Sequence, residues 1–268
     1  MTTAFILILL ATGTGVGFAG GLLGVGGSFI MTPVQYLLFV DMGVPLDTAI
    51  KLAFGTSMMV IVPTAASGTW RHHKEGAVWW RAALIMGGVG LAGAYGGASL
   101  ACILPGDSLK LAFGIIVIAA AIGMLIRRTV SADEKPRANP WLWAAWAAPI
   151  GLASGLVGLG GGVMAVPVMV LALRFTMHRA VATSLAFVMF TSIGGVIGYV
   201  VNGQGAYGLP LHSMGYVQLE TWGLLAATSI GMAQLGAKYA HRMPARALRY
   251  IFVGVMLYLG LRMLGAFG

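Results

Sequence analysis

Long runs of apolar residues, separated by short polar segments, make up most of the chain. Two of these runs, roughly 4–40 and 141–173, are broken by a cluster of glycines. The other six are unbroken and close to the ~20 residues that a helix needs to cross the hydrocarbon core of a bilayer. They cover roughly 50–70, 77–98, 108–127, 180–199, 218–238 and 246–265. The pattern predicts an all-α polytopic membrane protein.

The two broken runs are copies of one motif. The segment Gly17–Pro33 matches Gly151–Pro167, with glycines in register at 17/151, 21/155, 24/158, 26/160 and 27/161. Two further blocks match in the same order: Thr56-Ser57, Thr64 and Gly68 with Thr183-Ser184, Thr191 and Gly195, then Gly97, Pro105 and Leu109 with Gly236, Pro244 and Leu248. Matched blocks in one order indicate a duplicated structural unit. We predict a first repeat over 1–128, a linker over 129–140 and a second repeat over 141–268.

The part of each broken run that follows its glycines is too short to cross a membrane comfortably. Segments 28–40 and 163–173 would form helices of about 20 and 16 Å, whereas the hydrocarbon core is about 30 Å thick. We therefore expect each broken run to form a re-entrant helical hairpin, which enters and leaves the membrane on the same side. Each repeat then consists of one hairpin and three transmembrane helices.

The positions of the basic residues test this interpretation. If each broken run crossed the membrane once, the 16 Lys and Arg residues would divide evenly between the two sides. If each run turns back, all of them lie on one side except Lys51, Lys110 and Arg262. Such a bias is typical of cytoplasmic loops. It predicts an inverted second repeat, both termini outside, and cytoplasmic segments at 71–81, 127–140, 174–180 and 238–249.

Composition narrows the class of protein further. Hydrophobic residues make up 59% of the 268 residues and charged residues only 9%, too few to cover a water-facing surface. The 41 glycines suit closely packed membrane helices. The net charge of +9 does not indicate nucleic-acid binding, because the basic residues form short clusters between apolar runs. The first 22 residues lack the basic start of a signal peptide, so we expect them in the mature protein.

The sequence offers no pattern of a known catalytic or nucleotide-binding site. It lacks the H-E-x-x-H, Walker A and G-x-S-x-G motifs, and its seven acidic residues fall at or near predicted loops. The single cysteine, Cys102, excludes a disulfide framework and a thiolate metal cluster. We therefore expect no enzyme activity, no cofactor and no metal.

The glycine clusters are the strongest candidates for a binding site. Glycine permits tight turns with uncovered amides, which a membrane tolerates only where protein or a water-filled cavity satisfies them. A short helix starts after each cluster, and helix N-termini attract anions. Hydroxyl groups follow in the next span of each repeat. We predict an anion site formed by Gly24, Gly26, Gly27, Ser28, Gln35, Lys51, Thr56, Ser57, Gly158, Gly160, Gly161, Gly162, Thr183 and Ser184.

The glycines and hydroxyls of this set also have a structural interpretation. The glycines allow helices to pack closely, although a proline five residues beyond Ser28 and beyond Gly162 favours a true break. The hydroxyls can bond to a carbonyl of the preceding helical turn instead of to an anion. Both interpretations of these residues stay open at this point.

Four polar side chains have ambiguous roles. Gln35 has Met169 as its counterpart in the second copy and would be an asymmetric contact. Lys51 either attracts an anion or extends its ammonium group to the membrane interface, which is the commoner use. His72 and His73 lie in a predicted basic loop, where solvation is favoured over a role in sensing pH.

The repeated glycine blocks resemble those of the sulfite exporter TauE/SafE family of membrane permeases. The resemblance covers nearly the whole chain. It rests on Gly17–Pro33 with Gly151–Pro167, on Gly55-Thr56-Ser57 with Ala182-Thr183-Ser184, and on the Pro105 and Pro244 blocks. It implies movement of sulfite, a sulfonate, a related sulfur oxyanion or an organic anion across the bacterial inner membrane, commonly outward.

These observations lead to one interpretation and two rivals. The chain is interpreted as an alternating-access anion carrier with its site between the two hairpin tips. A channel in which two half-helices meet at mid-membrane is the first rival. A membrane-embedded enzyme is the second, and it is disfavoured because Cys102 maps near the outer end of a span. The expected partners are a small anion and the lipid bilayer, and a homo-oligomer is compatible with the sequence.

Overall fold

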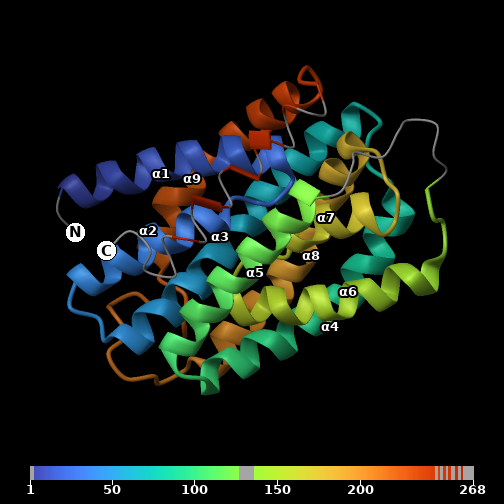
Figure 1. The fold of residues 1–268 in the computed structure, drawn as a ribbon. Helices are drawn as coiled ribbons and strands as arrows, with labels where there is room; N and C mark the ends of the chain where they lie inside the picture. Colours follow the sequence, from blue (N-terminus) through green and yellow to red (C-terminus); the bar gives the residue numbers. More distant parts are fainter. Residues whose placement is uncertain are drawn as a thin grey trace.

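The chain folds into a bundle of helices (Figure 1). The computed structural model describes residues 3–126 and 136–244, with scattered positions between 247 and 261. The continuous ranges are helical, with no strand beyond one isolated bridge between Ser213 and Gln218. The helices are α1 (Thr3–Leu23), α2 (Ser28–Asp41), α3 (Leu46–Lys74), α4 (Trp80–Ile103), α5 (Gly106–Ile126), α6 (Pro140–Val157), α7 (Gly162–Leu171), α8 (Met177–Asn202) and α9 (Leu219–Ala240).

Six of these helices, α1, α3, α4, α5, α6 and α8, are long and apolar enough to cross a membrane. This confirms an all-helical chain with several membrane spans. The set differs from the predicted spans in two respects. It includes α1 and α6, which are the first arms of the broken runs, and it leaves out α9, which has 22 residues. Helices α2 and α7, with 14 and 10 residues, are the predicted short arms. Residues 129–135 of the predicted linker, and most of the predicted last span, lie outside the described residues.

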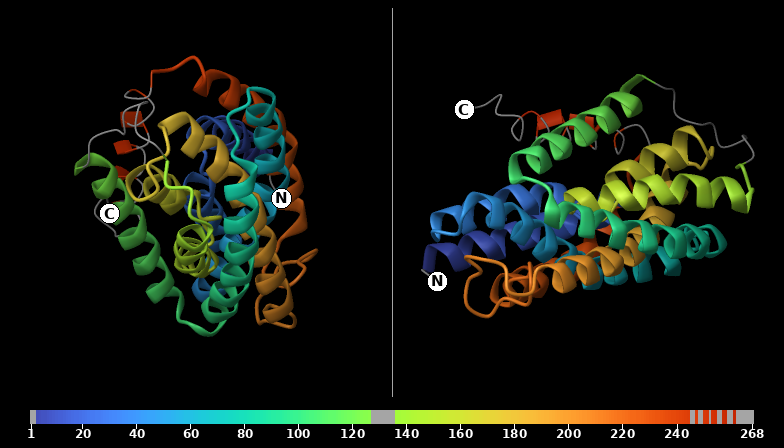
Figure 2. Two further views of the ribbon diagram at one scale, coloured as in Figure 1. Left: turned by 90° about the vertical axis from the view of Figure 1, so that its right-hand side faces the viewer. Right: turned by 90° about the horizontal axis from the view of Figure 1, so that it is seen from below.

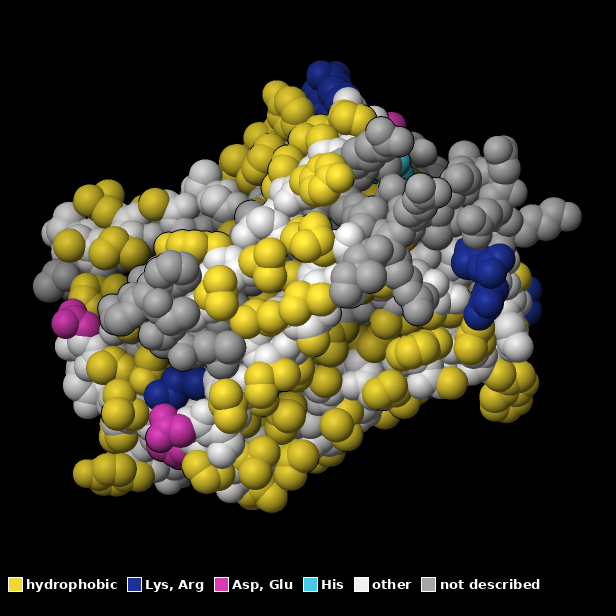
Figure 3. All heavy atoms as spheres, in the orientation of Figure 1, with side chains coloured by type: hydrophobic (Ala, Val, Ile, Leu, Met, Phe, Trp, Pro, Cys, Tyr) yellow, Lys and Arg dark blue, Asp and Glu magenta, His cyan; other side chains and the backbone are white. Residues whose placement is uncertain are grey.

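Helices α3 and α8 form the centre of the bundle. In their most apolar stretches 78% and 72% of the residues are buried, whereas the other spans have 35–44%. The remaining helices therefore surround this pair and present their outer faces to the surroundings. Figure 3 shows that apolar side chains cover the long side of the bundle, as expected for contact with lipid tails.

The loops gather at two opposite ends of the bundle (Figures 1 and 2). End A is formed by the start of α1 and by residues 42–45, 104–105 and 203–218. There the Thr48 hydroxyl donates to the Tyr207 carbonyl, 2.9 Å away. End B is formed by residues 75–79, 136–139, 172–176 and 241–244. There the amide of Arg137 donates to the carbonyl of Leu173, also at 2.9 Å.

The two broken runs start from different ends. Helix α1 starts at end A, and α2 returns to end A, where it meets residues 42–45 (Figure 1). Helix α6 starts at end B, and α7 returns to end B, where it meets residues 172–176. Both turns are therefore in the interior of the bundle, away from either end.

The first helix of each copy packs in the same way against a helix of the other copy. Helix α1 packs along α9, and α6 packs along α4 (Figure 1). Glycines make both contacts so close that an added β-carbon would overlap the backbone of the partner helix. The pairs are Gly17 with Ser229, Gly21 with Ala233, Gly151 with Gly90 and Gly155 with Ala94. Each pair on one side has its counterpart on the other under the repeat alignment.

Basic side chains are concentrated at end B. The described Lys and Arg residues there are Arg71, Lys74, Arg81, Arg137, Arg174, Arg179, Lys238 and Arg242, whereas end A has Lys51 and Lys110. On the face drawn in Figure 3, Lys and Arg gather at the right and the top, with one further group beside acidic side chains at the lower left.

The loop predicted at 71–81 is shorter in the structure. Helix α3 continues to Lys74, so its last turn includes both histidines. His73 is exposed, but His72 is fully buried against the end of α1. The prediction of two solvated histidines is therefore wrong for His72, because helix periodicity turns the two neighbouring side chains to different faces.

Candidate functional site

Both glycine clusters interrupt their helices with backbone that favours glycine. In the first break, between α1 and α2, Gly24, Gly26 and Gly27 have φ values of 74°, 75° and 85°. In the second break, between α6 and α7, Gly158, Gly160 and Gly161 have φ values of 63°, 67° and 87°. A side chain at such a φ value is strained, so glycine at these positions is a requirement of the turn itself. From here the first break means residues 24–27, and the second break residues 158–161.

The two breaks are in direct contact. The hydroxyl of Ser28, at the start of α2, donates to the carbonyl of Leu159 in the second break, 2.7 Å away. From the other side, Gly162 at the start of α7 lies so close to Val25 that an added β-carbon would overlap it. Residues that are 131 positions apart in the sequence therefore form one buried contact in the interior.

Both short helices begin with amides that have no acceptor. No hydrogen bond within the described ranges takes a proton from the amides of Val25 to Phe29 or of Gly160 to Val163. All of these residues are buried. The first amides of any helix lack a partner within the helix, and a helix N-terminus carries a partial positive charge. The two helix starts therefore bring a set of uncommitted donors to one place in the interior.

Hydroxyl groups of α8 hold the carbonyls of the two breaks. Ser184 donates to the carbonyl of Gly24, 2.8 Å away, and Thr191 donates to the carbonyl of Gly160. These carbonyls are thus occupied, whereas the amides from Val25 to Phe29 and from Gly160 to Val163 have no acceptor in the described ranges. The side chains of Ile61 and Val188 lie between the breaks, since an added β-carbon on either Gly26 or Gly160 would contact both of them.

Two serines beside the second break have hydroxyls without a partner. Ser154 on α6 and Ser192 on α8 are fully buried, and neither Oγ atom has a hydrogen-bond partner among the described residues. The Oγ of Ser192 lies 3.0 Å from the position of a β-carbon on Gly160, and that of Ser154 lies 3.3 Å from one on Gly161. In the first repeat, Gly20 is the counterpart of Ser154 and Ala65 is the counterpart of Ser192. The second break is therefore the more polar of the two.

Ser57 forms a polar cluster with Thr32 and Gln35, which lie one and two helical turns beyond the start of α2. The hydroxyl of Ser57 accepts hydrogen bonds from Thr32, at 3.1 Å, and from the amide nitrogen of Gln35, at 3.2 Å. Gln35 is fully buried, and its Oε1 atom has no partner in the described part of the chain. This cluster belongs to the first repeat alone, since Met169 replaces Gln35 in the second.

Thr56 and Thr183 lie away from the breaks, at equivalent places in the two repeats. The hydroxyl of Thr56 accepts from the amide of Gln218, the residue before α9, at 3.0 Å. The hydroxyl of Thr183 accepts from the amide of Trp79, the residue before α4, at 3.1 Å. Each threonine thus ties a long central helix to the start of a surrounding helix, near opposite ends of the bundle.

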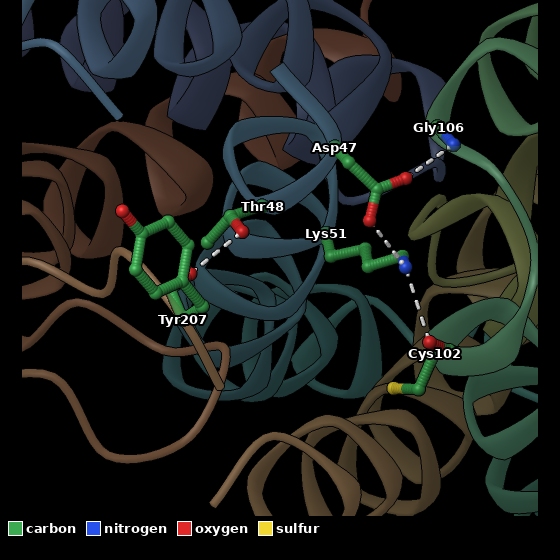
Figure 4. A network of polar contacts seen from close by, with 6 residues as sticks. All are labelled: Asp47, Thr48, Lys51, Cys102, Gly106 and Tyr207. Atoms are coloured by element: carbon green, nitrogen blue, oxygen red, sulfur yellow. Dashed lines mark hydrogen bonds and ion pairs between the residues drawn. The ribbon is translucent and has the colours of Figure 1, made fainter. Parts of the chain in front are cut away.

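Lys51 also has partners of its own near end A (Figure 4). Its ammonium group lies 2.8 Å from the Asp47 carboxylate and donates to the carbonyl of Cys102, 3.1 Å away. The other Asp47 oxygen accepts from the amide of Gly106, at 2.6 Å. Lys51 is 5% exposed, so these contacts replace its water shell. The network joins α3 to the corner between α4 and α5, and does not reach the breaks.

Comparison with known proteins identifies the family. The profile described as sulfite exporter TauE/SafE matches residues 9–263. The chain belongs to the sulfite exporter TauE/SafE family. With the six apolar helices, TauE/SafE membership makes it a multi-pass membrane protein of a transporter family.

Relatives of this TauE/SafE chain carry transporter names. It is 30% identical over 260 residues to a probable membrane transporter protein of Methanocaldococcus jannaschii, covering 96% of this chain and 94% of the relative. A probable membrane transporter protein of Haemophilus influenzae is 28% identical, with 97% and 98% covered. The probable membrane transporter protein YdhB of Bacillus subtilis is 28% identical, with 91% and 92% covered. No solved structure matches the chain.

Sequence reasoning did not place four polar residues of this TauE/SafE structure in the predicted site, namely Thr32, Ser154, Thr191 and Ser192. They are ordinary helix residues in the sequence, where a hydroxyl is more often bonded to the preceding turn. One signal was available, because Ser154 and Ser192 have the non-polar counterparts Gly20 and Ala65 in the repeat alignment. A polar residue at only one of two equivalent buried positions points to a local requirement of the second break.

Proposed function

We propose that this TauE/SafE chain is a secondary transporter that moves a small anion by alternating access. The anion we propose is sulfite, a sulfonate or a related small sulfur oxyanion or organic anion. We further propose export across the bacterial inner membrane. The family description, sulfite exporter TauE/SafE, supports both the chemical class and the direction.

The observation that carries the proposal is the contact of two helix starts in the interior. Each start has buried amides without acceptors, and an unsatisfied amide in a non-aqueous interior costs several kcal/mol, on the order of 2–7. An oxyanion removes this cost, because its oxygens accept several hydrogen bonds at once and its charge suits the positive ends of two helices. The free hydroxyls of Ser154 and Ser192 add two further donors.

The charges around the breaks also favour an anion. Helices α1, α6, α7 and α8 have no Asp or Glu, and the one acid of α2, Asp41, is at its far end. A cation would need carboxylates or several carbonyls as ligands. The carbonyls of Gly24, Leu159 and Gly160 are already taken by hydroxyls.

The packing between the breaks favours a carrier over a channel. Ile61 and Val188 fill the space between Gly26 and Gly160, and the breaks contact each other directly. An open pore needs a continuous polar path, whereas a carrier needs a closed centre that opens to one side at a time. We propose no enzymatic role.

We propose an inverted relation of the two repeats, with end B in the cytoplasm and both termini outside. The exchanged contacts of α1 with α9 and of α6 with α4 support the inversion, as do the breaks that are reached from different ends. The concentration of Lys and Arg at end B supports the orientation, since cytoplasmic loops carry the excess of basic residues.

Purified protein in proteoliposomes tests the transport function. Sulfite, thiosulfate, sulfoacetate, taurine and a simple carboxylate are each supplied outside as radiolabelled substrate, with the same unlabelled anion inside or absent. We expect saturable uptake of at least one oxyanion that is accelerated by the anion on the other side. Flux that rises linearly with concentration and ignores the other side would show a channel. Protein-free liposomes are the control.

A further inference from the structure

Two side chains at equivalent positions of the repeats hold the ends of α1 and α6. The Nε2 of His72, near the end of α3, lies 3.1 Å from the carbonyl of Gly21. The hydroxyl of Tyr199, near the end of α8, donates to the carbonyl of Gly155 at 2.8 Å. Gly21 and Gly155 are aligned glycines, and His72 follows Thr56 at the spacing at which Tyr199 follows Thr183.

Both contacts are made at the same point of the fold. Helix α1 ends at Leu23 and α6 at Val157, so the carbonyls of Gly21 and Gly155 lack the amide that a continuing helix would supply. His72 and Tyr199 supply the missing donor from the central pair of helices. Each therefore fixes the last turn before a break to a long helix, His72 on the end B side and Tyr199 on the end A side.

The two donors differ in their chemistry. A buried tyrosine hydroxyl keeps its proton at any physiological pH, whereas a histidine changes charge between about pH 5 and 8. Since a carbonyl only accepts, the Nε2 of His72 must carry a proton, and its Nδ1 is an acceptor when the ring is neutral. The Nε2 of His241 lies 2.9 Å from that Nδ1 and donates to it. His72 is thus held between Gly21 on α1 and His241 at the end of α9.

The groups around this pair can be named from every element that packs against it. Helix α3 contributes Arg71, which forms an ion pair at 2.6 Å with Glu75, the residue directly after the helix. Helix α8 contributes His178, whose ring centroid lies 6.1 Å from that of His241. Helix α1 contributes only the Gly21 carbonyl, because it has no charged residue.

Burial lowers the pKa of His241, and the neighbouring His178 and Arg71 lower it further, against the opposing effect of Glu75. The described part of the chain has no group of three His, Cys, Asp or Glu side chains that could hold a metal ion. The rings of His72 and His241 are joined by the hydrogen bond between them.

We propose that His72 and His241 form a proton-binding site through which pH at end B controls the attachment of the first hairpin to α3. A proton from water adds to a free lone pair of the His241 ring and makes the pair cationic. A buried cation is unfavourable, so the proton favours the state in which end B opens to water and the Gly21 contact is released. Tyr199 gives the second hairpin no such response. The proton is thus a second ligand, apart from the proposed anion site.

Hydrogen–deuterium exchange of the full chain in nanodiscs tests the proposal without any transport substrate. Peptides covering 17–27 and 151–161 are compared at pH 5.5 and 7.5, after correction for the intrinsic effect of pH on exchange. We expect corrected exchange over 17–27 to rise about tenfold at the lower pH, and exchange over 151–161 to change less than about twofold. An equal response of both segments, or none in 17–27, would overturn the proposal.

Three variants locate the effect. His72→Tyr copies the second repeat and should remove the pH response of 17–27 while the segment stays protected. His241→Gln keeps a donor toward His72 but cannot take the proton, and it should reduce the response as well. His73→Tyr alters the exposed neighbour, which contacts Trp80, and should leave the response unchanged. A response retained in both His72→Tyr and His241→Gln contradicts the proposal. Absence of sulfite transport would contradict the proposed function alone, because exchange is measured without an anion.

Discussion

The Ser28 hydroxyl and the Leu159 carbonyl join the two glycine breaks by a buried hydrogen bond of 2.7 Å. Ser28 opens a helix that returns to end A, and Leu159 belongs to a turn that is reached from end B. The bond therefore connects the two halves of the molecule at the point where both turn back. The counterpart of Ser28 in the second repeat is Gly162, which has no side chain. The second repeat therefore cannot donate an equivalent side-chain hydrogen bond to the first break.

Ser28→Ala should destabilise the contact between the breaks. The carbonyl of Leu159 would be left buried without its donor, which costs about 1–3 kcal/mol. We expect a lower Tm of the purified protein in detergent. Ser99→Ala is the matched control, because its exposed hydroxyl donates to the carbonyl of Tyr95 one turn earlier and accepts from the exposed side chain of Asn202, so that water can replace both bonds. An equal Tm for Ser28→Ala and the control would show that the contact adds nothing to stability.

Gly26→Val should abolish transport while the protein still inserts into the membrane. A β-branched residue at a φ of 75° is strained by about 1–3 kcal/mol, and its side chain would press on Ile61 and Val188. Gly43→Val has the same backbone strain, with a φ of 82°, but no atom lies near its added β-carbon. Uptake by vesicles of matched protein content separates the two. Transport that survives Gly26→Val would remove the first break from the mechanism.

Ser154→Ala and Ser192→Ala should weaken anion binding without lowering stability. Neither hydroxyl has a partner among the described residues, so its removal breaks no bond within the protein. Each lost donor to an anion should raise the Kd about tenfold, corresponding to about 1.4 kcal/mol. Titration of the purified protein with the transported oxyanion measures this. Ser229→Ala is the contrasting variant, because it loses the 2.7 Å bond to Thr64 and should lower Tm instead of affinity.

Lys51→Met should lower stability but leave the choice of anion unchanged. It removes the ion pair with Asp47 and the bond to the Cys102 carbonyl, at a cost of about 1–3 kcal/mol for groups that are mostly buried. Lys110→Met removes an ion pair whose acid is 94% exposed on its side chain, so it should cost less than about 1 kcal/mol. Tm and competition between oxyanions are measured for both variants. Altered competition in Lys51→Met alone would assign Lys51 to the anion site.

Reporter fusions should place the two ends on opposite sides of the membrane. Fusions that end at Ala138 or Thr176 lie at end B and should both report the cytoplasm. A reporter inserted at Gly208, at end A, should report the outside. Opposite signals from Ala138 and Thr176 would contradict the inverted arrangement, since both positions belong to the same end of the structure.

The sequence by itself determined the helices, their approximate limits and the two breaks. Apolar runs of membrane length have one stable backbone solution, and repeated glycines with a proline five residues later mark interruptions whatever surrounds them. The predicted arms 28–40 and 163–173 differ by at most two residues at either end from α2 and α7. Because the chain contains two copies of the motif, each break and each short arm could be recognised twice.

Only the tertiary structure decided how the polar side chains are used. The sequence grouped Thr56, Thr183 and Lys51 with the glycines, but they bond to Gln218, Trp79 and the Cys102 carbonyl, which belong to the ends of other helices and are connected with them by no local pattern. Conversely, Ser154 and Ser192 matter because their hydroxyls lie beside the second break, and the residues next to them in the sequence do not indicate this. Hydrogen-bond partners are set by which helices meet, and that depends on the packing of the whole bundle.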